Sequence, residues 1–185
     1  MEWADGKTRC FWANPKNERY IRYHDVEWGV PVRDDHKLFE MLILECFQAG
    51  LSWECVLNKR DGFREAFDDF DLDAVCAYDE AKLEALRNNP AIIRNRLKIH
   101  AAVTNAQAFR KIQQEYGSFS AYLWHWTDGR VIYETGQTHS PLSDQISKDL
   151  KNRGMKFVGT TVIYAYLQAV GVIYSHDGDC FLRHK

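Results

Sequence analysis

Helix start and stop signals recur along nearly the whole chain, and they limit its fold more than any other feature. Residues that can cap a helix N-terminus precede apolar stretches with helical spacing. The predicted helix starts are Asp34 or Asp35, Ser52, Asp71, Asp79, Ser118, Ser143, and Thr160 or Thr161. The predicted stops are Gly50, Gly117, Gly154 and Gly171. A strand-like segment at 131–133 is too short to build a sheet, so we predict an all-α helical bundle.

The composition fits one compact domain over residues 1–185. Of the 185 residues, 45% are apolar, enough to bury a core without covalent cross-links. No apolar run approaches the roughly 20 residues that span a bilayer, and the acidic N-terminus lacks an apolar signal region. Five cysteines at irregular spacing favour a reducing compartment over a disulfide framework. We expect a cytoplasmic protein with no membrane partner, acting as a monomer.

The formal net charge of −2 argues against the broad basic field that DNA-binding proteins usually carry. If this chain holds nucleic acid, it has to use local basic patches. Three groups of cations qualify: Lys59, Arg60 and Arg64; Arg94, Arg96 and Lys98; and Lys148, Lys151, Arg153 and Lys156. Each group can equally be the solvated face of a helix.

One connection between predicted helices has a chemical use that the others lack. One helix ends near Asn89, and the next runs over about 91–116. A tight helix–hairpin–helix directs the free N–H groups of its second helix outward, where they can hold a phosphate. The cations of the 94–98 patch follow directly. The same spacing also fits an ordinary αα-hairpin that binds nothing, so both interpretations stay open.

Two cysteines and two histidines stand near the two ends of the chain. Cys10 and His24 lie near the N-terminus, and His176 and Cys180 lie near the C-terminus. Two Cys and two His make a closed tetrahedral zinc set, which leaves no position for a water and is therefore structural. Such a metal would tie the chain ends together. The alternative is buried thiols with scattered surface imidazoles.

The first third of the chain interleaves aromatic residues with acids. The aromatic residues are Trp12, Tyr20, Tyr23, Trp28 and Trp53. Flat aromatic walls suit a base taken out of the DNA stack, and they suit a cationic base best. For any single ring, a place in the core is the simpler explanation.

Glu45 lies on the apolar face of its predicted helix. It follows Leu38 by seven residues and Leu42 by three, and Ala49 comes one turn later. A carboxylate on an apolar stripe costs several kcal/mol unless it finds partners. The partner is either a neighbouring helix N-terminus or a ligand with donors or positive charge, and the spacing alone does not choose between them.

Several segments, in order along the chain, resemble one family. They are 20–31 (YIRYHDVEWGVP), 44–53 (LECFQAGLSW), 92–99 (IIRNRLKI), 156–161 (KFVGTT) with 168–169 (QA), and 176–180 (HDGDC). Together they resemble the signatures of 3-methyladenine DNA glycosylase I over nearly the whole chain. The resemblance implies a helix–hairpin–helix DNA glycosylase. Such an enzyme hydrolyses the N-glycosidic bond of 3-methyladenine in double-stranded alkylated DNA, giving the free base and an abasic site.

The resemblance also implies roles for particular residues. One structural zinc per chain would be held by Cys10, His24, His176 and Cys180. Glu45 and Tyr23 match the residues that hydrogen-bond the excised base, and Trp53 matches the residue that stacks on it. Trp12, Tyr20 and Trp28 would line the pocket. Leu51 would be the wedge into the gap left by the flipped nucleotide, and Arg94, Arg96 and Lys98 would contact DNA.

The chain departs from the family pattern at a few positions. Phe11 and Cys46 stand where glycine is common, Phe47 replaces a smaller or polar residue, and the hairpin carries Pro90. Asn105 falls where enzymes with the same hairpin have an assisting aspartate. Two other interpretations therefore stay open. One is a metallohydrolase whose metal keeps an open position, and the other is a non-catalytic module that binds alkylated DNA or a free purine.

Overall fold

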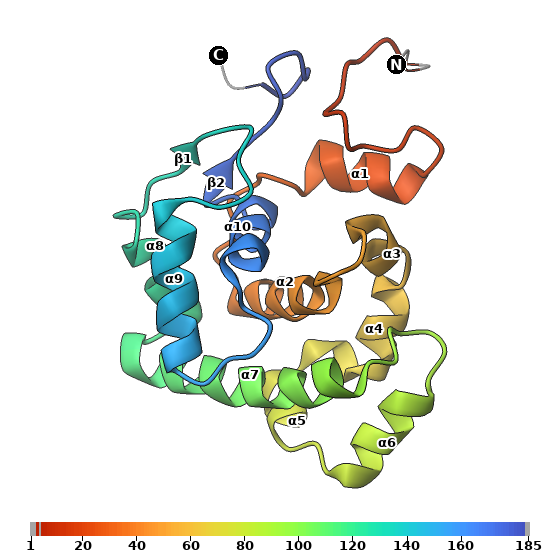
Figure 1. The fold of residues 1–185 in the computed structure, drawn as a ribbon, viewed down its shortest axis with the longest axis vertical. Coiled ribbons are helices and arrows are strands. Elements are labelled where there is room, and N and C mark those ends of the chain that lie inside the picture. The colour runs from red at the N-terminus through yellow and green to blue at the C-terminus, as the bar shows by residue number, and fades with distance from the viewer. Residues whose placement is uncertain (1–2, 4, 184–185) are drawn as a thin grey trace.

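Helices make up most of the fold, as the sequence predicts (Figure 1). The structure is a computed structural model, which describes residues 3 and 5–183. The helices within these residues are α1 (Glu18–Val26), α2 (Asp35–Gln48), α3 (Trp53–Asn58), α4 (Arg60–Ala66), α5 (Leu72–Cys76), α6 (Glu80–Asn88), α7 (Arg96–Tyr116), α8 (Phe119–His125), α9 (Pro141–Asn152) and α10 (Thr160–Ala169). A 3-10 turn, η1 (Asp68–Phe70), and two short strands, β1 (Ile132–Tyr133) and β2 (Ile173–Tyr174), complete the regular structure.

Side-chain caps fix five of the predicted helix starts. Each of the five caps accepts a hydrogen bond from the backbone N–H three residues further along the chain. The caps are Asp34, Ser52, Asp71, Asp79 and Ser118. A cap of this kind stabilises a helix by about 1 kcal/mol. These five predictions are confirmed. The sequence could predict them because each capping group and its target lie close together in the chain.

The start of α7 differs from the prediction. The helix begins at Arg96, whereas the sequence placed its start near Ala91. The Asn89 side chain accepts the Ala91 N–H, and Asn95 caps α7, so asparagine side chains hold 89–95 as a loop. Side-chain bonds to the backbone compete with helix formation in this way. The connection between α6 and α7 is therefore longer than the tight hairpin that the sequence predicts.

Two further elements differ from the prediction. α9 starts at Pro141 under a Ser140 cap, and Ser143 is the third residue of a reciprocal capping box rather than the start. The segment 131–133 does form sheet structure, because Ile132–Tyr133 pairs in parallel with Ile173–Tyr174. α1, which the sequence analysis did not predict, begins after an Asn17 cap.

α2 is the central helix of the fold. It packs against α3, α7, α8 and α10, and it lies in the middle of the bundle (Figure 1). The ten residues from Leu38 to Phe47 are all buried, as expected for a helix surrounded by other elements. This burial encloses Glu40 and Glu45. Arg64 and Lys37 bind the Glu40 carboxylate, whereas the Glu45 carboxylate faces a cavity.

The segment that follows α1 packs against the end of α10. The Gly29 N–H donates to the Gln168 carbonyl, and the Val32 N–H donates to the Val170 carbonyl, each at 3.0 Å. Gly171 has a φ of +71°, and a Cβ there would lie 2.3 Å from the Val30 carbonyl carbon. Only glycine permits this approach. The contact brings Trp28 beside α10, which forms the opposite side of the cavity.

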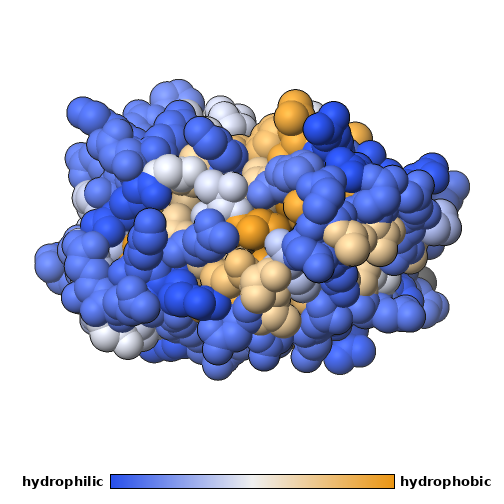
Figure 2. All heavy atoms as spheres, turned by 90° about the horizontal axis from the view of Figure 1, so that it is seen from below, coloured by the Kyte–Doolittle hydropathy of each residue, from blue (hydrophilic) through white to orange (hydrophobic). Residues whose placement is uncertain are grey.

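Figure 2 shows the molecule from below the view of Figure 1, and the face that it presents is largely hydrophilic. Apolar side chains gather near the middle of this face, inside a hydrophilic rim. Among the residues that the structure describes, no helix has the length and apolar character needed to cross a bilayer.

Candidate active site and metal cluster

A cavity of about 160 Å³ lies between α1, α2, α3 and α10. Its lining residues are Trp12, Tyr20, Tyr23, Trp28, Glu45, Gln48, Trp53, Ala165 and Gln168. The six residues that the sequence assigns to base binding are all in this lining, although they come from three separate parts of the first third of the chain. The cavity is thus walled by aromatic rings and contains one carboxylate.

Glu45 is the most unusual group in the cavity. Its side chain is deeply buried, and Oε2 accepts no hydrogen bond from the described residues. Burial away from water raises the pKa of Glu45 to about 8, because desolvation disfavours the charged form. Burial and the nearby Glu45 carboxylate also raise the pKa of Tyr23. The helix-terminus partner considered for Glu45 is not found, which leaves a ligand as the natural partner of this carboxylate.

Trp53 provides one wall and one unused donor. Ser52 caps α3, so Trp53 occupies the first helical position. The centroid of its ring lies 5.3 Å from that of Tyr23. The indole Nε1 is buried and donates to no described residue. Two residues that line the cavity therefore carry a polar atom with no described partner, an acceptor on Glu45 and a donor on Trp53.

Three more rings complete the aromatic wall. Trp12 lies 5.3 Å from Tyr20 and contacts Trp28 edge-on at 4.8 Å, measured between ring centroids. These distances are typical of packed aromatic pairs. The rings support one another, so the wall keeps its shape without a ligand.

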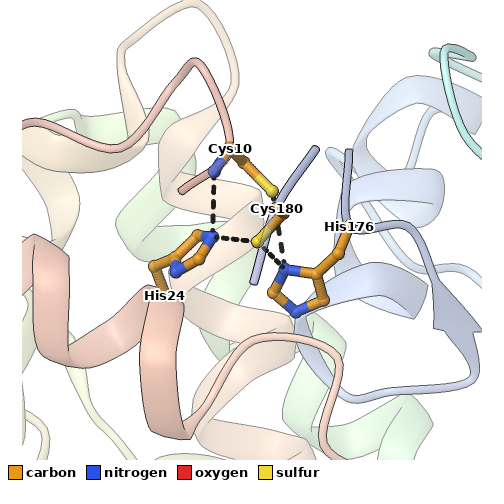
Figure 3. Close-up of side chains that lie close together, drawn as sticks. All are labelled: Cys10, His24, His176 and Cys180. Atoms are coloured by element: carbon orange, nitrogen blue, oxygen red, sulfur yellow. Dashed lines mark hydrogen bonds between the residues drawn. The ribbon is translucent and has the colours of Figure 1, made fainter. Parts of the chain in front are cut away.

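The two chain ends meet at a cluster of four side chains (Figure 3). Cys10, His24, His176 and Cys180 are all buried, and their ligand atoms lie within 4.8 Å of one another. His176 Nδ1 lies 3.4 Å from Cys10 Sγ and 3.5 Å from Cys180 Sγ, and His24 Nε2 lies 3.5 Å from Cys180 Sγ. The structure thus brings together four groups that the sequence separates by as many as 170 residues. Such a cluster can hold a metal ion.

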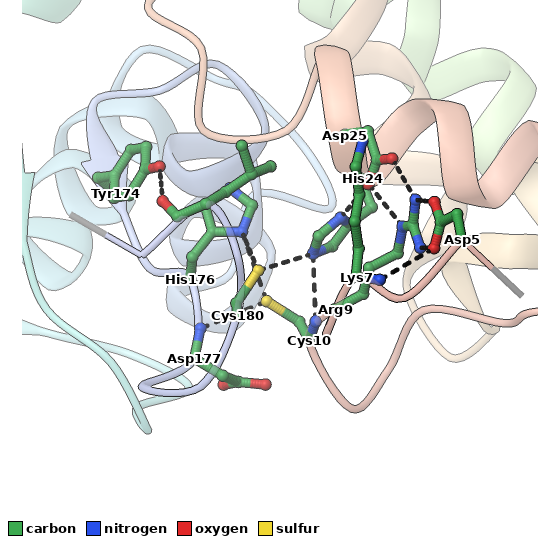
Figure 4. A network of polar contacts seen from close by, with 11 residues as sticks. Asp5, Lys7, Arg9, Cys10, His24, Asp25, Tyr174, His176, Asp177 and Cys180 are labelled. Carbon is green, nitrogen blue, oxygen red and sulfur yellow. Dashed lines mark hydrogen bonds and ion pairs between the residues drawn. The ribbon is translucent and has the colours of Figure 1, made fainter. Parts of the chain in front are cut away.

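An ion-pair network supports this cluster (Figure 4). His24 Nδ1 lies 2.8 Å from Asp25 Oδ1, which leaves Nε2 facing Cys180 Sγ and the backbone N–H of Cys10. The Arg9 guanidinium donates to both Asp25 oxygens, at 2.8 and 2.7 Å, and to both Asp5 oxygens. It also lies over the Trp3 ring. A carboxylate bonded to the second nitrogen of a histidine fixes the orientation of that ring.

The cluster also backs the aromatic wall of the cavity. The Trp12 ring lies 5.2 Å from the His24 ring, and the Trp28 ring contacts His176 edge-on at 4.7 Å. Two pocket-lining rings therefore rest on two of the four clustered side chains. The position of the wall depends on how well the cluster is held.

The four basic and apolar residues expected to contact DNA take different positions. Arg94 and Arg96 are exposed, and their side chains hydrogen-bond to no described residue. Leu51 is 42% exposed on the loop between α2 and α3. Lys98 differs, because its side chain is buried and its ammonium donates to backbone carbonyls. Leu97 is 70% exposed beside it, although the sequence assigned it no role.

Comparison with known proteins identifies the family. A family model described as methyladenine glycosylase matches residues 12–184. The chain belongs to the methyladenine glycosylase family. Within the methyladenine glycosylase family, DNA-3-methyladenine glycosylase 1 of Escherichia coli (strain K12) is 42% identical over 178 residues, which cover 93% of this chain and 95% of the relative.

Solved structures of methyladenine glycosylases have the same fold. A crystal structure of 3-methyladenine DNA glycosylase I matches with a TM-score of 0.91 at 43% identity, covering 96% of this chain and 100% of that chain. The Staphylococcus aureus protein, solved for the structural basis of its 3-methyladenine recognition, matches with a TM-score of 0.90 at 36% identity. That match covers 96% of this chain and 98% of that chain.

Three lining residues received no role from the sequence. Gln48 and Gln168 line the cavity. Each lies within a segment that resembles a family signature, and this membership was the one sequence feature that could have indicated a role for them. Ala165 precedes Gln168 by three residues on α10 and lies on the same face. Asn105 is buried but lies outside the cavity lining, and its amide binds both the N–H and the carbonyl of Lys156. Asn105 thus anchors the loop before α10.

Proposed function

We propose that this chain is a monofunctional DNA glycosylase that removes 3-methyladenine from alkylated DNA and leaves an abasic site. Its family and the names of its relatives support this activity. The observation that carries the proposal is the unpaired Glu45 carboxylate in a cavity with aromatic walls. A flipped base is recognised by stacking and by hydrogen bonds to its edge, and this cavity offers both.

The charge of the lesion explains why a buried carboxylate suits it. Methylation at N3 places positive charge on adenine, so the damaged base brings both a cation and N–H donors to Glu45. A buried charge without partners costs several kcal/mol, and the bound cation offsets that cost. Neutral adenine brings no charge, so it leaves the cost in place. The cavity therefore selects the lesion over the normal base.

The aromatic residues orient the base. Trp53 is assigned to stacking on it, and Trp12, Tyr20 and Trp28 are assigned to enclosing it. Tyr23 is assigned to hydrogen bonding beside Glu45. Cations bind to aromatic faces with about 2 kcal/mol or more when water is excluded. Stacking alone does not distinguish bases, so the carboxylate provides the discrimination.

The bond cleavage itself asks little of the protein. The bond between the sugar C1′ and N9 breaks, and its electron pair passes to the base, which cancels the positive charge of the base. Water then adds to C1′ and releases a proton. The charged base is already a good leaving group. Most of the rate enhancement therefore comes from flipping the nucleotide and holding the base in place. Glu45 and Tyr23 are the proposed catalytic residues, since both line the cavity that would hold the departing base.

Three exposed side chains are proposed to contact double-stranded DNA. Leu51 would fill the gap that the flipped nucleotide leaves, as an apolar wedge between base steps. Arg94 and Arg96 would contact phosphates beside the loop that precedes α7. We further propose that the protein acts as a monomer in the cytoplasm, in keeping with the unpaired state of its five cysteines.

The cluster at the chain ends is proposed to hold one structural zinc. Zinc bonds of about 2.3 Å to sulfur and about 2.0 Å to nitrogen, at tetrahedral angles, separate neighbouring ligands by about 3.5 Å. The sulfur–nitrogen separations of 3.4, 3.5 and 3.5 Å fit that value. Four protein ligands close the coordination shell, so the zinc would supply stability and no chemistry. This argues against the metallohydrolase interpretation.

Release of bases from alkylated duplex DNA tests the proposed activity. We expect the protein to release 3-methyladenine, detected by chromatography of the free bases, while unmodified adenine stays in the DNA. The strands should stay intact until alkali cleaves the abasic sites. Tight binding to alkylated DNA without any released base would instead support the non-catalytic binding module.

A further inference from the structure

Lys98 is buried at the start of α7 although it carries a positive charge. Its side chain is 6% exposed, and its Nζ donates to the Phe47 carbonyl at 2.8 Å and to the Ala49 carbonyl at 2.5 Å. The ammonium also lies 5.9 Å from the centre of the Phe157 ring. With two donors used and the third beside a ring, the ammonium has no free donor for a DNA phosphate.

The two carbonyls belong to the C-terminus of α2. The last carbonyls of a helix lack partners within the helix, and a cation is favoured near them. The last turn of α2 contains no basic residue of its own. Lys98 supplies that cation from another helix. A charged hydrogen-bonding pair of this kind is stronger than a neutral one.

The turn that Lys98 holds joins the cavity to the protein surface. The carbonyl of Gln48, between the two that bind Lys98, accepts the Leu51 N–H at 2.7 Å, so the turn is fixed at both sides. Gln48 lines the cavity, and Leu51 is exposed. Lys98 itself follows Arg96 by two residues. One buried ammonium thus connects the start of α7 to the turn between the cavity and Leu51.

We propose that Lys98 is a positioning residue for base excision, which holds the turn 48–51 so that Leu51 and the cavity keep their relative places on DNA. This proposal rests on the excision activity proposed above. It also replaces the expectation, drawn from the basic patch, that Lys98 contacts DNA itself. Misplacing a group by about 1 Å can slow a reaction by about a hundredfold, so loosening this turn should reduce the rate of excision.

Lys98→Met and Arg96→Met separate positioning from phosphate contact. Both variants remove one cation within the same turn of α7, and Met keeps the length of the lysine stem. Excision of 3-methyladenine is measured under single-turnover conditions at saturating enzyme, and DNA affinity is measured across a range of salt concentrations. We expect Lys98→Met to lower the saturating rate about tenfold or more with an unchanged salt slope. Arg96→Met should instead reduce the salt slope by about 1, as loss of one phosphate contact implies.

The opposite pattern overturns the proposal. A wild-type saturating rate in Lys98→Met, or a salt slope reduced as in Arg96→Met, would mean that Lys98 does not position the turn. Binding of free 3-methyladenine, followed by tryptophan fluorescence, should stay within about threefold of wild type, since Glu45 and Trp53 are held within the helices α2 and α3 on either side of the turn. If Lys98→Met fails to fold, Lys98→Gln undergoes the same measurements with the same expected results. A wild-type protein that releases no base would refute the proposed function instead.

Discussion

Glu45 shows how stability and binding compete at a single residue. Its burial on α2 raises its pKa to about 8, so the folded protein without a ligand resists ionisation of this group. The unfolded chain, in contrast, ionises near the ordinary pKa of 4.5. The fold therefore keeps a group that weakens it at neutral and alkaline pH. A function that needs a buried negative charge explains this arrangement.

Glu45→Gln should stabilise the protein in a pH-dependent way. A raised pKa in the folded state means that wild-type stability is fully present below pH 4.5 and declines as the pH rises towards 8. Gln is neutral throughout, so the variant should gain up to roughly 5 kcal/mol on wild type between pH 4.5 and 9. The free energy of unfolding, measured in urea across this range, checks it. A difference between the two proteins that stays constant with pH would contradict this assignment.

Residue positions could be predicted from sequence better than side-chain directions. Periodicity placed Glu45 on an apolar face, and the family signature placed Trp53 in the pocket; both line the cavity. The same reasoning placed Lys98 in an exposed basic patch, and it is buried. Along the first turn of a helix, consecutive residues face different neighbours, and which neighbour lies there depends on the tertiary fold. The partner carbonyls of Lys98 are about fifty residues away in the sequence.

At the scale of elements, α1 connects the cavity to the Cys/His cluster formed by Cys10, His24, His176 and Cys180. It provides Tyr20 and Tyr23 to the cavity, and its next residue, His24, belongs to the cluster. Asp25 on the same helix binds His24 and is held by Arg9. The orientation of α1 is thus set at its C-terminal end by an ion pair.

Asp25→Asn should weaken the binding of zinc to the cluster. The substitution keeps the size of the side chain and removes the charge that orients His24, and loss of such a partner costs about 10- to 100-fold in metal affinity. Competition with a chromophoric chelator measures the affinity. Asp5→Asn is the matched control, because Asp5 binds Arg9 without contacting His24. Equal affinities of the two variants would show that Asp25 does not support the metal.

Local signals predicted helix elements, and non-local contacts decided the exceptions. The Asp34 and Ser52 caps act within one turn, so the sequence was sufficient for α2 and α3. The sequence predicts that 131–133 is too short to build a sheet, but β1 pairs with β2, which lies about forty residues further along the chain. α1 has mixed polarity, and of its three buried residues Tyr20 and Tyr23 line the cavity and His24 belongs to the Cys/His cluster. Its apolar pattern is therefore weak.

At the scale of the whole molecule, the two terminal segments meet behind one wall of the cavity. The Phe181 N–H donates to the Thr8 carbonyl at 2.8 Å, so the two terminal segments lie side by side. The Cys/His cluster lies between them, and its histidines contact Trp12 and Trp28. Residue type already named these four residues as a candidate zinc set, with buried thiols and scattered imidazoles as the alternative, and the family resemblance favours the zinc set. Their spacing does not decide between the two, because no sequence pattern shows that residues at opposite ends of a chain meet.

The proposed function depends on one carboxylate, that of Glu45, binding a positively charged base. Glu45→Gln is compared with Glu54→Gln by the single-turnover rate of 3-methyladenine release from alkylated duplex DNA. Glu54 is a suitable control, since it lies outside the cavity lining, and Gln can keep its bonds from Asn14 and Asn17 through Oε1.

We predict that Glu45→Gln releases 3-methyladenine at least about tenfold more slowly, as loss of one charged hydrogen bond worth about 1.5 kcal/mol implies. Glu54→Gln should match wild type. A folded Glu45→Gln protein that releases the base at the wild-type rate would contradict the central claim.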